Sequence, residues 1–236
     1  MTGVVGPVKL LLFDLDGTIL RSVRGADPFH DAMRETFGVD VDLHAMRPDG
    51  KTDPSIIREL LERAGVTTDL DRPTLAAFEA CLAARMRAAL AAGTTRFEAI
   101  SGVREVLESL ARDARFALAV LTGNLQASAH LKLGSAGLAD FFCVGAFGSD
   151  HVLRRELPDI ARERFERRMG VTVTRSACVI VGDTPLDHAA AEANGMPCVL
   201  VASGRTPLDE LRALEPAAAF ADWSDPVAMH RVLAEL

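Results

Sequence analysis

Lysine is scarce in this chain of 236 residues, because only three of its 26 basic residues are lysines, namely Lys9, Lys51 and Lys132. Any role that requires a lysine therefore has few candidates. Aromatic residues make up only 5% of the chain, the net charge is −7, and no block of basic residues occurs. These features argue against a nucleic-acid partner, which needs clustered positive charge and rings that stack on bases.

Long apolar segments are also missing. No stretch approaches the roughly 18 apolar residues of a membrane span, and the N-terminus lacks a charged region followed by a long apolar run. We therefore expect a cytoplasmic protein with no membrane partner. No apolar stripe or heptad run marks an interface, so we expect a monomer or a weak homodimer. Buried reduced thiols are the expected state of the four cysteines, which lack C-x-x-C spacing: Cys81, Cys143, Cys178 and Cys198.

Short apolar runs alternate with helical patterns from about residue 100 onward. Continuous runs of this kind are typical of strands covered on both faces, as in a parallel sheet. Helical spacing begins at Val103 and at Pro158, the latter with Ile160, Phe165 and Met169 as its apolar stripe. The pattern predicts a doubly wound, Rossmann-like α/β sheet. Its strands are K-L-L-L-F before Asp14, F-A-L-A-V-L before Thr122, A-C-V-I-V before Gly182, C-V-L-V before Ala202 and, more weakly, A-A-A-F at 217–220.

The stretch from about 20 to 95 breaks this alternation and reads as helices only. Helical patterns start near Phe29, Pro54 and Thr74, and glycines lie near their ends. We interpret this stretch as an inserted all-helical domain. The chain is long enough for such an insertion, so we expect a core domain formed by residues 1–19 and 96–236 and a second domain at 20–95.

Polar residues follow three of the predicted strands. One carboxylate at a strand end is commonly a turn or a helix cap, but here three sets meet where an open α/β sheet binds its ligands. Clustered carboxylates repel one another unless a cation neutralises them, and oxygen ligands with a phosphate suit Mg²⁺. Metal and carboxylate together indicate phosphoryl transfer through an aspartyl-phosphate. The sets are Asp14, Asp16 and Thr18, then Thr122, Gly123 and Asn124, then Asp183 and Asp187.

The motifs resemble those of the haloacid dehalogenase-like hydrolase superfamily. D14-L-D-G-T18, L-T122-G-N and G182-D-T-P-L-D187 follow the order of its motifs one, two and four. The helical insertion after the first motif is similar to the cap of the phosphoglycolate phosphatase-like branch. The resemblance covers essentially the whole chain, and it implies a Mg²⁺-dependent phosphatase that acts on a small phosphorylated metabolite.

The resemblance also implies roles for the acidic residues. Asp14 would be the nucleophile and a Mg²⁺ ligand. Asp16 would be the general acid and then the general base, and it would bind the metal through its backbone carbonyl. Asp183 would ligate the metal, and Asp187 would lie behind the direct metal ligands and help to hold them in position. His188, which follows Asp187, is interpreted as an exposed helix residue.

Phosphate contacts are implied for the second motif and the first loop. Thr122 would donate a hydrogen bond to a phosphoryl oxygen, and the amides of Gly123 and Asn124 would help because they lie near a helix N-terminus. Thr18 would belong to the substrate-binding loop and steady it.

A lysine is expected as motif three, but the segment SDHVLRRELPDIA from Ser149 has none. Arg154 lies where that lysine would fall and could pair bidentately with phosphate, although we expect that it cannot copy a lysine's point contact. Lys132 lies on the helix after Thr122, roughly 9 Å along it, with its stem pointing back toward the helix N-terminus. Either residue could instead lie on a solvated face. We expect that one of the two serves.

Gly50, Lys51 and Thr52 lie in the polar segment P-D-G-K-T-D-P of the insertion. They could form a plain loop with a helix N-cap, or contact the substrate as similar G-x-T-D segments do in the resembling branch. Lys51 could then meet an anionic group beyond the phosphate, which would favour phosphorylated acids or sugars.

Four alternative functions compete with this interpretation. Haloacid dehalogenation is disfavoured because it needs no general acid at Asp16. A β-phosphoglucomutase-like transfer uses the same core, and phosphonate cleavage would need Lys51 to form a Schiff base, for which a loop position is unfavourable. A non-catalytic binding module stays possible because a fold does not guarantee a function.

Overall fold

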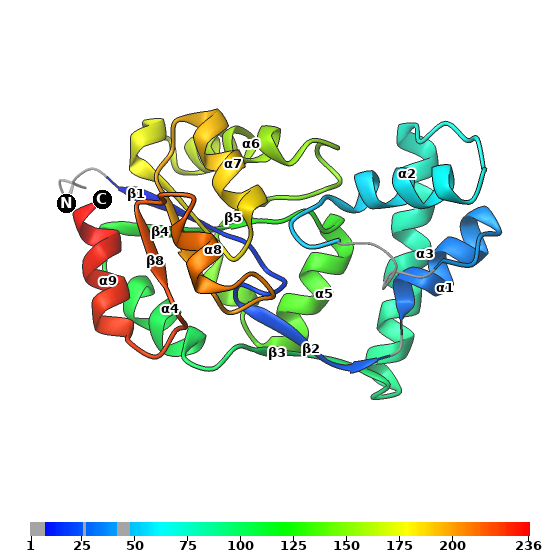
Figure 1. The fold of residues 1–236 in the computed structure, drawn as a ribbon, viewed down its shortest axis with the longest axis horizontal. Coiled ribbons are helices and arrows are strands. Elements are labelled where there is room, and N and C mark those ends of the chain that lie inside the picture. Colours follow the sequence, from blue (N-terminus) through cyan, green and yellow to red (C-terminus); the bar gives the residue numbers. More distant parts are fainter. Residues whose placement is uncertain (1–7, 26, 42–47) are drawn as a thin grey trace.

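A six-stranded parallel sheet forms the centre of the larger part of the molecule (Figure 1). The structure is a computed structural model that describes residues 8–25, 27–41 and 48–236. The strand order is β5-β4-β1-β6-β7-β8, and all neighbours pair in parallel. The strands are β1 (Lys9–Phe13), β4 (Phe116–Leu121), β5 (Val144–Ala146), β6 (Cys178–Gly182), β7 (Cys198–Val201) and β8 (Ala218–Phe220).

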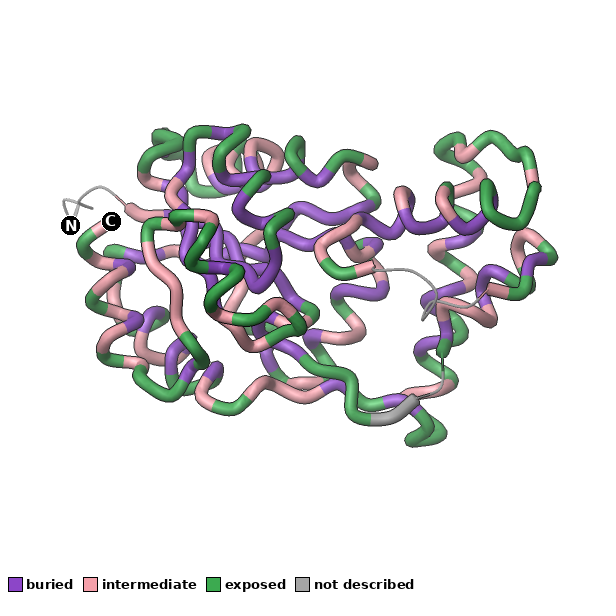
Figure 2. Tube along the Cα trace, in the orientation of Figure 1, coloured by how far each residue is buried: buried purple, intermediate pink, exposed green. Residues whose placement is uncertain are grey.

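Helices cover both faces of this sheet, as a doubly wound fold requires. Alternate residues of β1 show the two faces, because Leu11 and Phe13 pack with α4 (Val103–Ala111), α5 (Gln126–Ala136) and α9 (Pro226–Glu235). Leu10 and Leu12 pack with α6 (Leu157–Met169), α7 (Pro185–Asn194) and α8 (Leu208–Arg212). Buried residues accordingly run along the strands in Figure 2. Short 3-10 turns lie at η2 (Ala139–Phe141), η3 (Arg154–Glu156) and η4 (Arg175–Ala177).

Three helices form a smaller unit beside the sheet, and we call them the cap. They are α1 (Pro28–Phe37), α2 (Asp53–Arg63) and α3 (Arg72–Ala91), and they share a separate core that includes Met33, Ile57 and Phe78. The predicted fold class is therefore confirmed. The predicted helices from Phe29, Pro54, Thr74 and Val103 are also present.

A two-stranded antiparallel ribbon leads from the sheet to the cap (Figure 1). It pairs β2 (Leu20–Gly25) with β3 (Thr95–Ala99). The expectation of helices only between 20 and 95 is wrong at residues 20–25. The ribbon crosses the expected domain boundaries near residues 19 and 96, which stay a prediction.

Two further expectations about helix faces are corrected. Met169 is 55% exposed, because α6 turns Leu157, Ala161 and Phe165 toward the sheet instead. His188 is only 8% exposed, because α7 packs against β6, β7, α6 and η3 at once. Cys178 and Cys198 are buried free thiols as expected, whereas Cys81 and Cys143 are only partly buried. Within the described ranges, no helix has both the length and the apolar character to cross a bilayer.

Candidate active site

The ends of the three central strands bring the predicted residues together. Asp14 follows β1, Thr122 follows β4 and Asp183 follows β6, and β4 and β6 are the two neighbours of β1. The backbone N–H of Asp14 donates to the carbonyl of Val181 at 2.9 Å, which holds the end of β1 in the sheet. The Thr18 hydroxyl lies 2.7 Å from Asp183 Oδ1 and 3.2 Å from Asp14 Oδ2. Thr18 therefore steadies the carboxylates from a fully buried position.

Three buried carboxylates form the centre of this site. Asp14, Asp183 and Asp187 each offer an oxygen, and these oxygens lie within 4.8 Å of one another. Burial raises the pKa of Asp14 to about 6 and that of Asp183 to about 8, and the neighbouring carboxylates add to both shifts. A hard divalent cation would relieve this repulsion and would accept oxygen ligands of this kind. The residues therefore fit Mg²⁺.

Glycines make room for the Asp183 carboxylate. A Cβ atom on Gly17 would lie 2.5 Å from Asp183 Oδ2, and one on Gly204 would lie 1.7 Å from the same atom. Gly17 also has a φ of +85°, a backbone angle that residues with a side chain rarely adopt. The carboxylate thus lies in a cradle that larger residues would fill.

Arg154 is the cation that faces the carboxylates. Its Nη2 donates to Asp14 Oδ1 at 2.8 Å and to Asp187 Oδ1 at 2.5 Å, and its side chain is only 7% exposed. Burial opposes its charge, but Asp187 and Asp14 raise the pKa of Arg154 above its ordinary value. Both bonds use one nitrogen, so Arg154 contacts the two carboxylates through a single donor atom, while its contact with phosphate stays a prediction.

Asp187 is held by both of its oxygens. Oδ1 accepts from Arg154, and Oδ2 accepts from the backbone N–H of Thr184 at 3.1 Å and from its hydroxyl at 2.7 Å. The bond from the backbone N–H of Thr184 belongs to the capping box that begins α7. The helix cap therefore also orients an acidic residue of the site.

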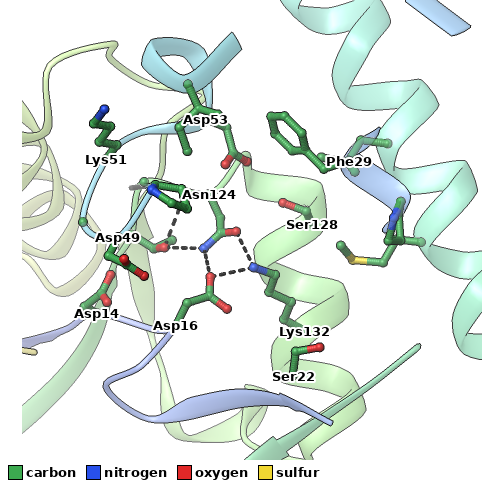
Figure 3. A pocket seen from close by; sticks show the side chains of 18 of the residues that line it. Asp14, Asp16, Ser22, Phe29, Asp49, Lys51, Asp53, Asn124, Ser128 and Lys132 are labelled. Carbon is green, nitrogen blue, oxygen red and sulfur yellow. Dashed lines mark hydrogen bonds and ion pairs between the residues drawn. The ribbon is translucent and has the colours of Figure 1, made fainter. Parts of the chain in front are cut away.

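Lys132 and Asn124 hold the side chain of Asp16 (Figure 3). Lys132 Nζ donates to Asp16 Oδ2 and to Asn124 Oδ1, both at 2.6 Å. Asn124 Nδ2 donates to Asp16 Oδ2 at 2.6 Å and to Thr122 Oγ1 at 2.8 Å. The structure therefore gives the two candidate cations separate places, Arg154 beside Asp14 and Lys132 beside Asp16.

A cleft of about 420 Å³ opens above these residues, between the sheet and the cap. Gly50 and Lys51 line it as predicted, but Lys51 Nζ is paired with Glu59 Oε2 at 2.5 Å. Thr52 does not line the cleft; it caps α2, and its hydroxyl donates to the carbonyl of Val152 at 2.6 Å. The loop and N-cap interpretation therefore fits Thr52. The core residues that line the cleft are Asp14, Asp16, Thr122, Gly123, Asn124, Ser128, Lys132 and Arg154.

A family model for haloacid dehalogenase-like hydrolases matches residues 8–195. The chain belongs to this family. The match includes both the strand-end carboxylates and the cap, and of the site residues described above it leaves out Gly204. None of the curated proteins matches the sequence of this hydrolase.

Several solved structures share this fold. A predicted phosphoglycolate phosphatase from Haemophilus somnus 129PT superposes with a TM-score of 0.67 at 20% identity, covering 94% of this chain and 98% of that one. A HAD family hydrolase from Deinococcus radiodurans R1 with bound phosphate and sodium gives 0.55 at 21% identity, covering 98% of both. A candidate β-phosphoglucomutase from Thermotoga maritima gives 0.56 at 18% identity, covering 95% and 99%. At these identities the likeness shows the fold.

The cap of this hydrolase docks on the first turn of α5, a contact that the sequence did not reveal. Asp53 Oδ2 accepts from the backbone N–H of Leu125, and Glu79 Oε1 accepts from that of Ala127, both at 2.8 Å. The N–H of Asp53 donates in return to the carbonyl of Gly123 at 2.7 Å. Two cap carboxylates therefore satisfy amides at a helix N-terminus, where negative charge is favoured.

Asp53 is expected to make the stability of the hydrolase depend on pH. Burial raises its pKa to about 6 from an ordinary value of 3.8, so the native state binds a proton more tightly than the unfolded chain does. The contribution of this proton to the free energy of unfolding is fully present below pH 3.8 and is lost as the pH rises through 6. We expect Asp53→Asn, which keeps an acceptor for Leu125, to stabilise the fold at pH 8 by about 1–3 kcal/mol. Urea denaturation at pH 4 and pH 8 tests this, and an equal gain at both values would contradict it.

Lys132→Met is expected to lower kcat by about 100-fold. This is the size of effect expected when a general acid–base residue, here Asp16, is no longer held in position. The change removes the ammonium that fixes Asp16 but leaves Asp14 and Arg154 in place. The pH profile of kcat should also change, which a purely structural defect would not cause. Lys9→Met is the matched control, because Lys9 Nζ donates to the carbonyls of Leu233 and Ala234, away from the cleft. Equal kinetics in the two variants would contradict a role for Lys132.

Proposed function

We propose that this hydrolase is a Mg²⁺-dependent phosphatase that cleaves a small phosphomonoester through an aspartyl-phosphate on Asp14. The observation that carries the proposal is the arrangement of Asp14 and Asp16. Asp14 is buried beside Asp183 and Arg154, whereas the Asp16 side chain is 45% exposed and faces the cleft. The two carboxylates therefore suit opposite parts of one displacement, nucleophile and proton carrier.

The chain's residues account for each proton and bond in the reaction. The Asp14 carboxylate attacks phosphorus, and the bond to the leaving alcohol breaks as Asp16 gives that oxygen a proton. Asp16, now a carboxylate, takes a proton from a water that attacks the aspartyl-phosphate. Phosphate leaves, and Asp14 returns as a carboxylate.

Thr122 and Arg154 are placed to bind the phosphoryl oxygens. Thr122 Oγ1 accepts from both the backbone and the side chain of Asn124, and among the described residues it donates to none, so its hydrogen can go to phosphate. Mg²⁺ held by Asp14, Asp183 and the Asp16 carbonyl would supply Lewis-acid stabilisation of the transferred group. Asp187 would orient Arg154 behind it.

Phosphonate cleavage is less well supported. A Schiff base needs a lysine amine that is free to attack a carbonyl, whereas Lys51 Nζ is paired with Glu59 Oε2 at 2.5 Å. We therefore propose a phosphomonoester as substrate, in a protein that acts as a monomer or a weak homodimer.

The test is phosphate release by the purified full chain from p-nitrophenyl phosphate and a panel of small phosphoesters. We expect turnover with Mg²⁺ that stops with EDTA and returns when Mg²⁺ is added in excess. Mg²⁺ should also raise the melting temperature, and Asp183→Asn should weaken both effects. Release no greater than that of Asp183→Asn on every ester would refute the phosphatase proposal and favour phosphotransfer or a binding role.

A further inference from the structure

The cleft has an apolar wall that the reaction itself does not require. The wall comes from the cap and the ribbon, and most of its side chains are closely packed. Figure 3 shows Phe29 on the side of the cavity formed by the cap helices. Such a wall accepts hydrocarbon from the substrate, because burying apolar surface is favourable whereas burying unpaired polar groups is not. Its residues are Pro28, Phe29, Ile56, Leu82, Met86 and Phe97.

The charged residues of the cleft disfavour a second anion on the substrate. Among the lining residues within the described ranges, carboxylates outnumber cations by five to three. The carboxylates are Asp14, Asp16, Asp27, Asp49 and Asp53, and the cations are Lys51, Lys132 and Arg154. A bound Mg²⁺ would offset the two negative charges of the phosphoryl group, so the lining residues would keep this excess of negative charge and would repel a carboxylate or a second phosphate on the leaving group.

Each of these cations is already paired. Lys51 lies 2.5 Å from Glu59, Lys132 lies 2.6 Å from Asp16, and Arg154 lies 2.8 Å from Asp14. In Figure 3 the Lys51 side chain also points away from the labelled carboxylates of the cleft. Arg205 approaches Asp49 to 3.6 Å, but its side chain is 72% exposed and does not line the cleft.

The cleft is larger than a two-carbon acid would fill. About 420 Å³ is within the range of pockets that enclose ligands with a ring or a short branched chain. In the proposed reaction phosphate would occupy the end of the cleft at Thr122 and Arg154, which leaves the remainder beside the apolar wall.

We propose that the substrate is the phosphate monoester of an apolar alcohol without a second anionic group, with its hydrocarbon part against Phe29, Leu82 and Met86. This inference rests on the proposed phosphatase function and narrows it. It replaces the expectation that Lys51 selects phosphorylated acids or sugars, because Glu59 already neutralises Lys51.

The test compares kcat/KM of the Mg²⁺-loaded full chain for two matched esters. These are 2-phenylethyl phosphate and 2-(4-carboxyphenyl)ethyl phosphate, whose leaving alcohols differ little in reactivity, so that the ratio reports on the cleft. We expect the uncharged ester to be preferred by at least about tenfold, which corresponds to about 1.4 kcal/mol. Phosphoglycolate should be poorer than 2-phenylethyl phosphate by a similar factor or more.

A positive charge placed in the wall should weaken or abolish this selectivity. Phe29 is only partly buried, so Phe29→Arg is expected to fold and to shift the ratio toward the carboxylated ester by at least about tenfold. Phe29→Ala should lower kcat/KM for 2-phenylethyl phosphate more than for ethyl phosphate. An unchanged ratio in Phe29→Arg would overturn the place given to the hydrocarbon.

The outcomes separate the two proposals. If the wild-type chain hydrolyses the carboxylated ester or phosphoglycolate as well as 2-phenylethyl phosphate, the inference about the substrate fails while the phosphatase function stands. If it hydrolyses none of the esters, including p-nitrophenyl phosphate, the phosphatase function itself fails.

Discussion

Asp14→Asn is expected to lower phosphate release by at least about 1000-fold, the scale of losing a nucleophile. The amide cannot attack phosphorus, so no aspartyl-phosphate forms. The variant should fold, because an asparagine oxygen can accept from Arg154 Nη2, and its amide nitrogen can donate to the Thr18 hydroxyl oxygen. Initial rates of phosphate release with saturating Mg²⁺ measure the effect.

The same variant should melt at a higher temperature than the wild-type chain when both are free of Mg²⁺. Asparagine removes one of three buried carboxylates that lie within 4.8 Å of one another, which lessens their repulsion. Thermal unfolding with EDTA present tests this. Loss of activity together with a lower melting temperature would indicate misfolding, and retained activity would exclude Asp14 as the nucleophile.

Arg154→Met is expected to cost about 3–5 kcal/mol in free energy of unfolding, because it leaves Asp14 and Asp187 buried without their cation. It should also lower kcat by more than about 100-fold, since a charge at the phosphoryl group is lost. Arg154→Lys should keep kcat within about tenfold of wild type, because the arginine contacts both carboxylates through a single nitrogen. Urea denaturation and phosphate release give the two quantities.

Arg155→Met is the matched control, because this neighbouring side chain is 64% exposed and, within the part of the chain that the structure describes, pairs only with Glu156 at 3.3 Å. We expect its stability to change by less than about 0.5 kcal/mol. If Arg154→Lys were as inactive as Arg154→Met, the planar guanidinium rather than its charge would be the essential feature.

The sequence predicted the sheet wherever a strand was a continuous apolar run. β1 and β4 are such runs, and they were expected at their observed places. β5 was missed because Val144–Ala146 is short and has a central glycine. β2 and β3 were missed because the sequences LRSVRG and TRFEA contain charged residues and no continuous apolar run, and the two strands pair with each other. Their pairing depends on contacts between segments about 75 residues apart, which local patterns do not encode.

The candidate site was predictable where its residues follow strands. Asp14, Thr122 and Asp183 end neighbouring strands, so the topology alone brings them together. Asp53 and Glu79 could not be found this way, because their partners lie 72 and 48 residues along the chain and depend on how the cap docks. The buried face of α6 was predicted wrongly at Met169 for a similar reason, because the elements packed around α6 decide which of its faces is buried.

The start of α5 lies beside the proposed phosphate site and also carries the docking contact of the cap. The segment from Thr122 to Asn124 is placed to bind phosphate, and the amides that follow it are bonded to Asp53 and Glu79 of the cap. The cap therefore cannot swing away from the sheet without releasing the peptide groups next to the phosphate site. Entry of substrate and formation of its binding loop would then occur together, and exit of phosphate would loosen the docking contact between the cap and α5.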